Sequence, residues 1–124
     1  MKVETPLGDI VDKITILRIK RIKLLKDDAI SNVEKELAAL LVAWKDAGLP
    51  EPESLDCYEP LASVNSKLWI IEDDLRLLEK RGLFGEEFIS KARKVYKLND
   101  LRSNLKRRIN TRLGSRLTEE KSHC

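Results

Sequence analysis

The sequence predicts an all-α protein, an antiparallel four-helix bundle made of two helical hairpins. Apolar residues recur at three- and four-residue steps in four stretches of the chain, and this spacing places them on one face of a helix. The 124 residues include only 5 Gly and 4 Pro, whereas a fold of many short strands needs more turn residues. Charged residues make up 36% of the chain, an excess that is typical of long exposed helices or a coiled coil.

The first helix is expected to run from an N-cap at Thr5, with Pro6 as its first helical residue, to about Lys26, because a hydroxyl cap followed by Pro is a common helix start. Its apolar residues cover more than one stripe: Leu7, Ile10, Val11, Ile14, Ile16, Leu17, Ile19, Ile22 and Leu25. A helix that is apolar over most of its circumference is buried on several sides. Since a four-helix bundle has no central helix, we expect a homodimer through the first helix.

The second helix is expected to follow a turn at Asp27–Asp28, with Ser31 or Asn32 as its N-cap and Gly48 as its end. Its apolar face consists of Val33, Leu37, Leu40, Trp44 and Ala47. An acidic, Pro-broken connector over residues 49–54 follows. Because it is short, we expect it to join two hairpins within one domain.

The third helix is predicted over residues 59–81 and the fourth over residues 86–113, with Gly114 as its end. The third helix carries an apolar seam of Leu61, Val64, Leu68, Ile71, Leu75 and Leu78. The first half of the fourth helix is expected to turn Phe88, Ala92, Val95 and Tyr96 inward. These elements predict a single helical-bundle domain over residues 1–114 and a polar C-terminal tail over residues 115–124.

The formal charge of +3 conceals a strong asymmetry. Residues 91–116 hold ten Lys or Arg and one acid, whereas residues 27–59 hold nine acids and two Lys. A basic helix can face nucleic acid, a membrane or an acidic ligand, but oppositely charged helices also lie side by side on solvated surfaces. Nucleic-acid binding is not favoured, because only 5% of the residues are aromatic and no recognised binding motif is present.

Residues that bind metals or cofactors are sparse. Cys57 and Cys124 share no close spacing, and His123 is the only histidine, so we expect no metal and no cofactor. Lys or Arg interrupts the apolar runs every few residues, which argues against a membrane-spanning segment. The chain shows no secretory leader at its start. Together these features predict a cytoplasmic protein that has no membrane partner.

Polar residues occur where the core of the bundle is expected. Steps of about 100° per residue place seven of them on inward faces of the first, third and fourth helices: Arg18, Arg21, Asn65, Glu72, Asn99, Arg102 and Lys106. A charge in a core must be paired, because an isolated buried charge is very costly. We therefore expect Glu72 to lie within salt-bridge reach of at least one of the basic residues.

Two interpretations of this cluster remain open. In the first, Glu72 forms a core salt bridge and the two asparagines complete its hydrogen bonds, which fixes the register of the helices. In the second, Arg18, Arg21 and Arg102 bind a small anionic ligand through carboxylate or phosphate groups. Glu72 is then the candidate catalytic acid or base, although we favour a protein without enzymatic activity.

Five stretches of the chain resemble a small bacterial and phage family that is catalogued only as a domain of unknown function. They are Pro6–Lys13, Val64–Asn65, Leu68–Asp73, Asn99–Arg102 and Glu119–Ser122. The resemblance implies a link to carbohydrate or cell-envelope synthesis. It also adds Asp9, Asp12 and Lys13 to the polar residues of interest, at the end of the bundle nearest the second half of the fourth helix.

We therefore expect a non-enzymatic, homodimeric interaction or accessory protein with a possible protein partner. One alternative is a binding protein or enzyme for a small anionic metabolite that uses the inward Arg, Asn and Glu side chains. A second alternative is non-specific binding of nucleic acid through the basic fourth helix.

Overall fold

The computed structural model describes residues 6–118, with side chains over residues 6–114. It contains α1 (Leu7–Lys23), α2 (Asp27–Asp46), a short 3₁₀ helix η1 (Pro52–Ser54), α3 (Tyr58–Lys80) and α4 (Glu86–Thr118). No strand is present in residues 6–118. The all-α class and the helical bundle that the sequence predicts are confirmed for this part of the chain.

Two helix ends lie where their glycines predict. Gly48 has a φ of 77° just after α2, and Gly82 has a φ of 71° just after α3. Glycine adopts this left-handed conformation without steric cost and commonly follows the last residues of a helix. After α3, the N–H of Leu83 donates to the carbonyl of Leu78 at 2.9 Å, which pairs a carbonyl that the helix end would otherwise leave free.

The start of α2 differs from the prediction. The helix begins at Asp27, so neither Ser31 nor Asn32 is its N-cap. Leu24 and Lys26 have extended backbone conformations, and the chain reverses over these few residues. The two acids that the sequence assigned to a turn therefore stand in the first turn of α2, where carboxylates interact favourably with the positive end of the helix dipole.

The end of α4 also differs, because the helix continues through Gly114 to Thr118. Gly114 does not adopt a left-handed conformation, so it does not end the helix as Gly48 and Gly82 do. The N-cap expected at Thr5 and the last residues of the expected tail, 119–124, lie outside the described residues.

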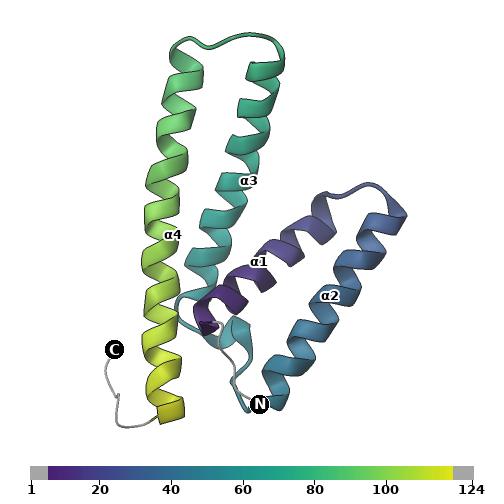
Figure 1. Cartoon of the computed structure of the whole chain (residues 1–124), viewed down its shortest axis with the longest axis vertical. Coiled ribbons are helices and arrows are strands. Elements are labelled where there is room, and N and C mark those ends of the chain that lie inside the picture. Colours follow the sequence, from purple (N-terminus) through teal and green to yellow (C-terminus); the bar gives the residue numbers. More distant parts are fainter. Residues whose placement is uncertain (1–5, 119–124) are drawn as a thin grey trace.

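Helix α1 has a central position in the bundle (Figure 1). It contacts α2 on one side and both α3 and α4 on the other, and α4 runs back alongside α3 (Figure 1). Val11 and Ile14 of α1 are fully buried. The wide apolar arc of α1, which led us to expect a homodimer, is therefore largely covered within one chain, and the dimer needs another observation to support it.

The apolar core consists of two clusters that share α1. The larger cluster joins α1 to α3, α4 and the end of α2 and contains Val11, Trp44, Leu49, Cys57, Tyr58, Leu61, Val64, Leu68, Leu105, Ile109 and Leu113. The smaller cluster joins α1 to α2 and contains Ile14, Leu17, Val33 and Leu37. Successive turns of α1 thus contribute to each cluster, which is why the apolar residues of this helix cannot form a single stripe.

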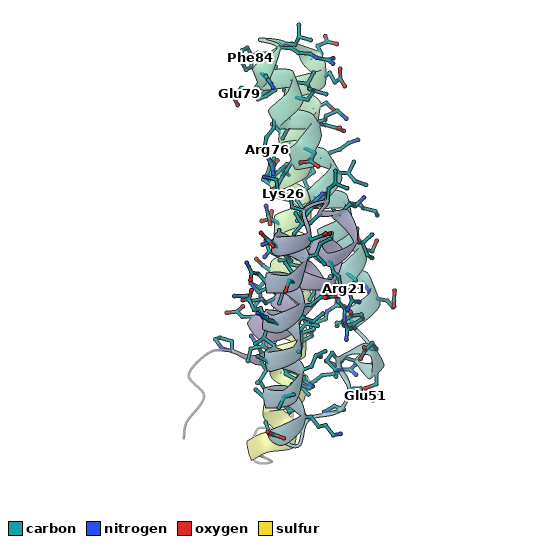
Figure 2. All side chains as sticks on the ribbon, turned by 90° about the vertical axis from the view of Figure 1, so that its right-hand side faces the viewer. Arg21, Lys26, Glu51, Arg76, Glu79 and Phe84 are labelled. Carbon is teal, nitrogen blue, oxygen red and sulfur yellow. The ribbon has the colours of Figure 1, made fainter. Side chains whose placement is uncertain are left out.

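The distal hairpin, residues 70–98, is the part of α3 and α4 that extends beyond the other helices. Figures 1 and 2 show that α1 crosses the opposite half only, with α2 on the far side of α1, and that Arg76, Glu79 and Phe84 lie beyond Lys26 at the α1–α2 turn. Tyr96 is 57% exposed and Ala92 is exposed, contrary to the inward orientation that their spacing predicted. Two helices packed side by side leave this face of α4 uncovered, and no third helix lies against it in the described residues.

Candidate functional site

Asp12 of α1 is the centre of a buried group of polar side chains. Its carboxylate is 7% exposed and lies against α3 and α4. Arg102 donates from Nε to Oδ1 at 2.9 Å and from Nη2 to Oδ2 at 2.6 Å. This two-pronged geometry is the strongest form of the Arg–carboxylate pair, because two parallel charge-assisted hydrogen bonds form at once.

Three further side chains complete the hydrogen bonds of this pair. Asn65 Nδ2 donates to Asp12 Oδ1 at 2.9 Å and to Thr15 Oγ1 at 2.8 Å. The Thr15 hydroxyl donates to the carbonyl of Asp12 at 2.7 Å. Asn99 accepts a hydrogen bond from Nη1 of Arg102 at 3.2 Å. Every buried side-chain nitrogen and oxygen in the described residues has a partner, as a stable buried network requires.

The electrostatics favour the charged form of both groups. Burial alone would raise the pKa of Asp12, but hydrogen bonds from Arg102 and Asn65 and the charges of Arg102 and Lys106 outweigh it and lower that pKa. The hydrogen bond to Asp12 raises the pKa of Arg102 in spite of burial. Both side chains of the pair are therefore charged. The Arg102 N–H groups that could bind a ligand already donate to Asp12 and Asn99.

Helix α1 approaches α4 closely at Gly8, one turn before Asp12. A Cβ atom at Gly8 would lie 2.3 Å from the carbonyl oxygen of Lys106, so only glycine fits without a shift of the backbone. The Gly8 N–H donates to Asn110 Oδ1 at 2.6 Å, and Lys106 Nζ lies 3.0 Å from Asp9 Oδ1. We name this set of contacts the polar junction; it consists of Gly8, Asp9, Asp12, Thr15, Asn65, Asn99, Arg102, Lys106 and Asn110.

The junction contains four of the seven side chains that the sequence placed in a core cluster: Asn65, Asn99, Arg102 and Lys106. Its buried acid, however, is Asp12 and not Glu72. Glu72 is exposed and makes no hydrogen bond or ion pair with the described residues, although its charge contributes to the raised pKa of Arg102. The expected salt bridge of Glu72 is wrong, because Glu72 lies two turns beyond Asn65, where α1 no longer covers α3.

The two arginines of α1 do not reach the junction. Arg18 lies at the connector between the hairpins, where Nη1 donates to the Tyr58 hydroxyl at 2.7 Å and Nη2 lies 2.7 Å from Glu53 Oε2. Arg21 is exposed and makes no hydrogen bond or ion pair with the described residues. The predicted site residues are thus divided among the junction, the connector and two separate exposed positions, Arg21 on α1 and Glu72 on α3.

Asp12 and Thr15 were absent from the predicted cluster. Gly8, Asp12 and Thr15 recur at four- and three-residue steps, so a small or polar stripe crosses a helix that is otherwise apolar. This stripe was the available signal, and the family resemblance did include Asp12. Helical periodicity alone could not show that this stripe, and not the one with Arg18 and Arg21, faces α3 and α4.

A lysine-rimmed groove lies between α3 and α4, with a volume of about 420 Å³. Ile70, Ile71 and Leu98 line it, together with Lys67, Lys94 and Lys97. None of these three lysines forms an ion pair within residues 6–114, whereas the nearby Lys91 lies 3.2 Å from Asp74. The groove therefore combines an apolar floor with positive charges that have no partner in the described chain.

Two other kinds of site can be addressed within the described residues. No three His, Cys, Asp or Glu side chains there lie close enough together to hold a metal ion. None of the helices in the same residues has the length and apolar character needed to cross a membrane.

Comparison with known proteins gives a family and no characterised relative. No curated protein and no solved structure matches the chain. A family model described as "Family of unknown function (DUF6165)" matches residues 1–124, which agrees with the resemblance stated from the sequence. Because that match covers the whole chain, this protein belongs to the family of unknown function DUF6165.

Proposed function

We propose that this protein is a non-enzymatic interaction module that binds an acidic amphipathic helix of a partner protein in the lysine-rimmed groove. The single observation that carries the proposal is the groove itself, where apolar side chains and unpaired lysines meet between α3 and α4. An amphipathic helix that lays its apolar face into such a groove is a recurring mode of recognition.

The α3 side of the groove faces away from the polar junction, and Lys67 and Ile70 on that side are exposed. Asn65 contacts α1, whereas Lys67 follows two positions later, about 200° further round α3. A helix bound there would cover Ile70 on the side that α1 and α2 leave open. It would add a third helix to the distal hairpin, as α1 does at the opposite end.

The charge of the groove favours a partner that is acidic. Lys67 lies on α3, and Lys94 and Lys97 lie on α4, so positive charges flank the apolar floor from both sides. Glutamates or aspartates beside the apolar residues of a partner helix would pair with them and increase the association rate. A symmetric groove-to-groove dimer would instead place lysines opposite lysines, which is unfavourable.

A homodimer through α1 remains part of the proposal, with a smaller surface. Most of α1 is covered by the other helices, but Ile22 at its end and Leu25 after it are exposed, Leu25 by 92%. These two side chains form an apolar tip at the α1–α2 turn. We also place the partner of the groove among proteins of carbohydrate or cell-envelope synthesis, the context that the family resemblance suggests.

The test selects single helices from a displayed random library against the intact protein. We expect the enriched helices to carry acids beside apolar residues at three- and four-residue steps. Ile70→Glu should weaken their binding about tenfold or more, since it puts a carboxylate in the apolar floor. Leu77→Glu is the matched control, because Leu77 is similarly exposed on α3 and does not line the groove.

Three results would contradict the proposal. Enrichment of basic helices would show that the lysines are not the recognition element. Equal loss of binding for Ile70→Glu and Leu77→Glu would show that the helices bind elsewhere. Tighter binding of a single-stranded oligonucleotide than of any selected helix, with a steep salt dependence, would favour the nucleic-acid alternative.

A further inference from the structure

A second pocket lies where α1, α2 and the connector meet, with a volume of about 410 Å³. Leu41, Trp44, Leu49 and Pro52 form its apolar walls, and Arg18 and Glu53 lie at its charged end. We propose that this pocket binds a small carboxylate with an apolar body, and that the ligand's carboxylate replaces that of Glu53 on Arg18. This site is separate from the groove and does not depend on the interaction proposed for it.

Arg18 is held in place from the protein side. The Tyr58 hydroxyl accepts from Nη1 at 2.7 Å, and the guanidinium lies 5.7 Å from the centre of the Tyr58 ring. Tyr58 is itself buried in the main apolar cluster. The hydrogen bond and the cation–π contact restrict the guanidinium before a ligand arrives, so that less freedom is lost on binding.

Glu53 covers the other side of Arg18. Its Oε2 lies 2.7 Å from Nη2, but the Glu53 side chain is 50% exposed, whereas Arg18 is 22% exposed. Glu53 belongs to the three-residue helix η1 on the surface. An ion pair with one half-exposed partner contributes little to stability, so an incoming carboxylate can take its place at small cost.

The walls of the pocket suit an apolar ligand body. Trp44 is buried, and its indole N–H donates to the carbonyl of Pro50 at 2.5 Å, which fixes the orientation of the ring. Leu49 is buried beside it. The volume lies within the range of about 300–1,000 Å³ that small-molecule sites occupy. Small-molecule sites commonly combine apolar walls with a few polar or charged groups that orient the ligand, as Arg18 does here.

The charges around the pocket select for a single negative charge. Lys45 lies at the rim with Arg18, and Glu51 lies there with Glu53. Lys45 forms no ion pair within the described residues, so it can attract the ligand's carboxylate. A doubly charged phosphate would meet stronger repulsion from Glu51 and from the displaced Glu53 than a singly charged carboxylate does.

The test uses 3-phenylpropionate and octanoate as probes, with their uncharged amides as controls. In a Trp69→Phe background Trp44 is the only tryptophan, so its fluorescence and its indole N–H resonance report on the pocket. We expect both acids to change these signals and both amides to bind about tenfold more weakly, since the charge-assisted hydrogen bonds to Arg18 are lost.

Substitutions at the charged end make the test specific. Glu53→Gln should tighten the binding of both acids several-fold, because it removes the competing carboxylate; Glu51→Gln, on the same rim but without a bond to Arg18, should have a smaller effect. Arg18→Gln should weaken binding about tenfold, and a thermal melt checks that this variant folds. If Arg18→Gln does not fold, two other variants still test the proposal. Glu53→Gln should bind the acids more tightly, and Lys45→Gln should bind them more weakly, because Lys45 attracts the ligand's carboxylate.

Three results would overturn the proposal. Equal affinities for acids and amides would show that Arg18 does not recognise the carboxylate. An unchanged affinity in Glu53→Gln would show that Glu53 does not compete for the site. A Trp44 signal that stays constant at millimolar concentrations of both acids would show that the pocket does not admit them.

Discussion

At the scale of single residues, one buried acid, Asp12, links three helices. Asp12 connects α1 to Arg102 of α4 and to Asn65 of α3. Helical periodicity identified both partners, because each stands on an inward face of a regular helix. It could not identify Asp12 as their partner over Glu72, because the choice depends on where α1 lies in space.

The first prediction concerns the two acids. Asp12→Asn should lower the free energy of unfolding by about 3 kcal/mol, since it leaves the partly buried Arg102 without its counter-charge. Glu72→Gln is the matched control and should change that free energy by less than about 0.5 kcal/mol, as exposed substitutions usually do. Urea unfolding of both variants measures the difference, and similar losses in the two would show that the junction is wrongly assigned.

The second prediction concerns pH. The pKa of Asp12 in the folded chain is lowered from the ordinary value of 3.8, so the unfolded chain takes up a proton at a pH where the folded chain does not. The contribution of Asp12 to stability is therefore complete above that ordinary value and is lost as the pH falls towards the folded-state pKa. The difference between wild type and Asp12→Asn should shrink from about pH 5 downwards, as thermal melts can show. A difference that grows on acidification would contradict the direction of the shift.

At the scale of the helices, local signals predicted what is decided locally. Gly48 and Gly82 ended α2 and α3 as expected, because a left-handed residue ends a helix whatever surrounds it. The predicted inward orientation of the first half of α4 is wrong at Tyr96. A face of a helical hairpin is buried only where a third helix packs against it. The central position of α1 could not be predicted either. A wide apolar arc is expected both for a helix buried in a dimer and for a helix that contacts three others within one chain.

The third prediction concerns the crossing of α1 and α4. Gly8→Ala should destabilise the protein by about 1–3 kcal/mol, because the added methyl group meets the backbone carbonyl of Lys106, which cannot rotate away. Gly85→Ala is the control: a Cβ atom there meets nothing within 4 Å, and Gly85 does not have a positive φ. Its effect should stay below about 1 kcal/mol. Equal effects in chemical unfolding would mean that the helices do not cross closely at Gly8.

At the scale of the whole molecule, apolar surface is distributed unevenly. The half with α1 and α2 buries both apolar clusters, whereas the distal hairpin leaves Ile70, Leu77 and Phe84 about half exposed. Exposed apolar side chains gathered on one part of a protein commonly mark a surface for a partner. The sequence indicated a surface for a partner only through the oversized apolar arc of α1, and it did not indicate the exposed side chains of the distal hairpin.

The fourth prediction concerns the oligomeric state. Light scattering at micromolar concentration should give twice the monomer mass of 14.3 kDa if the tip at Ile22 and Leu25 mediates the dimer. Replacing both residues by Glu should then yield a monomer, because two carboxylates oppose burial of the tip. Ile89→Glu, an exposed position on α4, serves as the control and should leave the dimer intact. A wild-type mass of 14.3 kDa would rule the dimer out.

The contacts of α1 also have a consequence for the order of events during synthesis. Gly8 and Asn110 are 102 positions apart, and Asp12 and Arg102 are 90 apart. Helix α1 therefore meets α2 early in synthesis but α4, its partner at Gly8 and Asp12, much later. Until α4 has emerged, Val11 cannot pack against that helix, and the Asp12 carboxylate cannot pair with the guanidinium of Arg102. Pairings of such long range also slow folding, because a large loop must close before they form. In a nascent chain, α1 should stay susceptible to proteases until α4 has been translated.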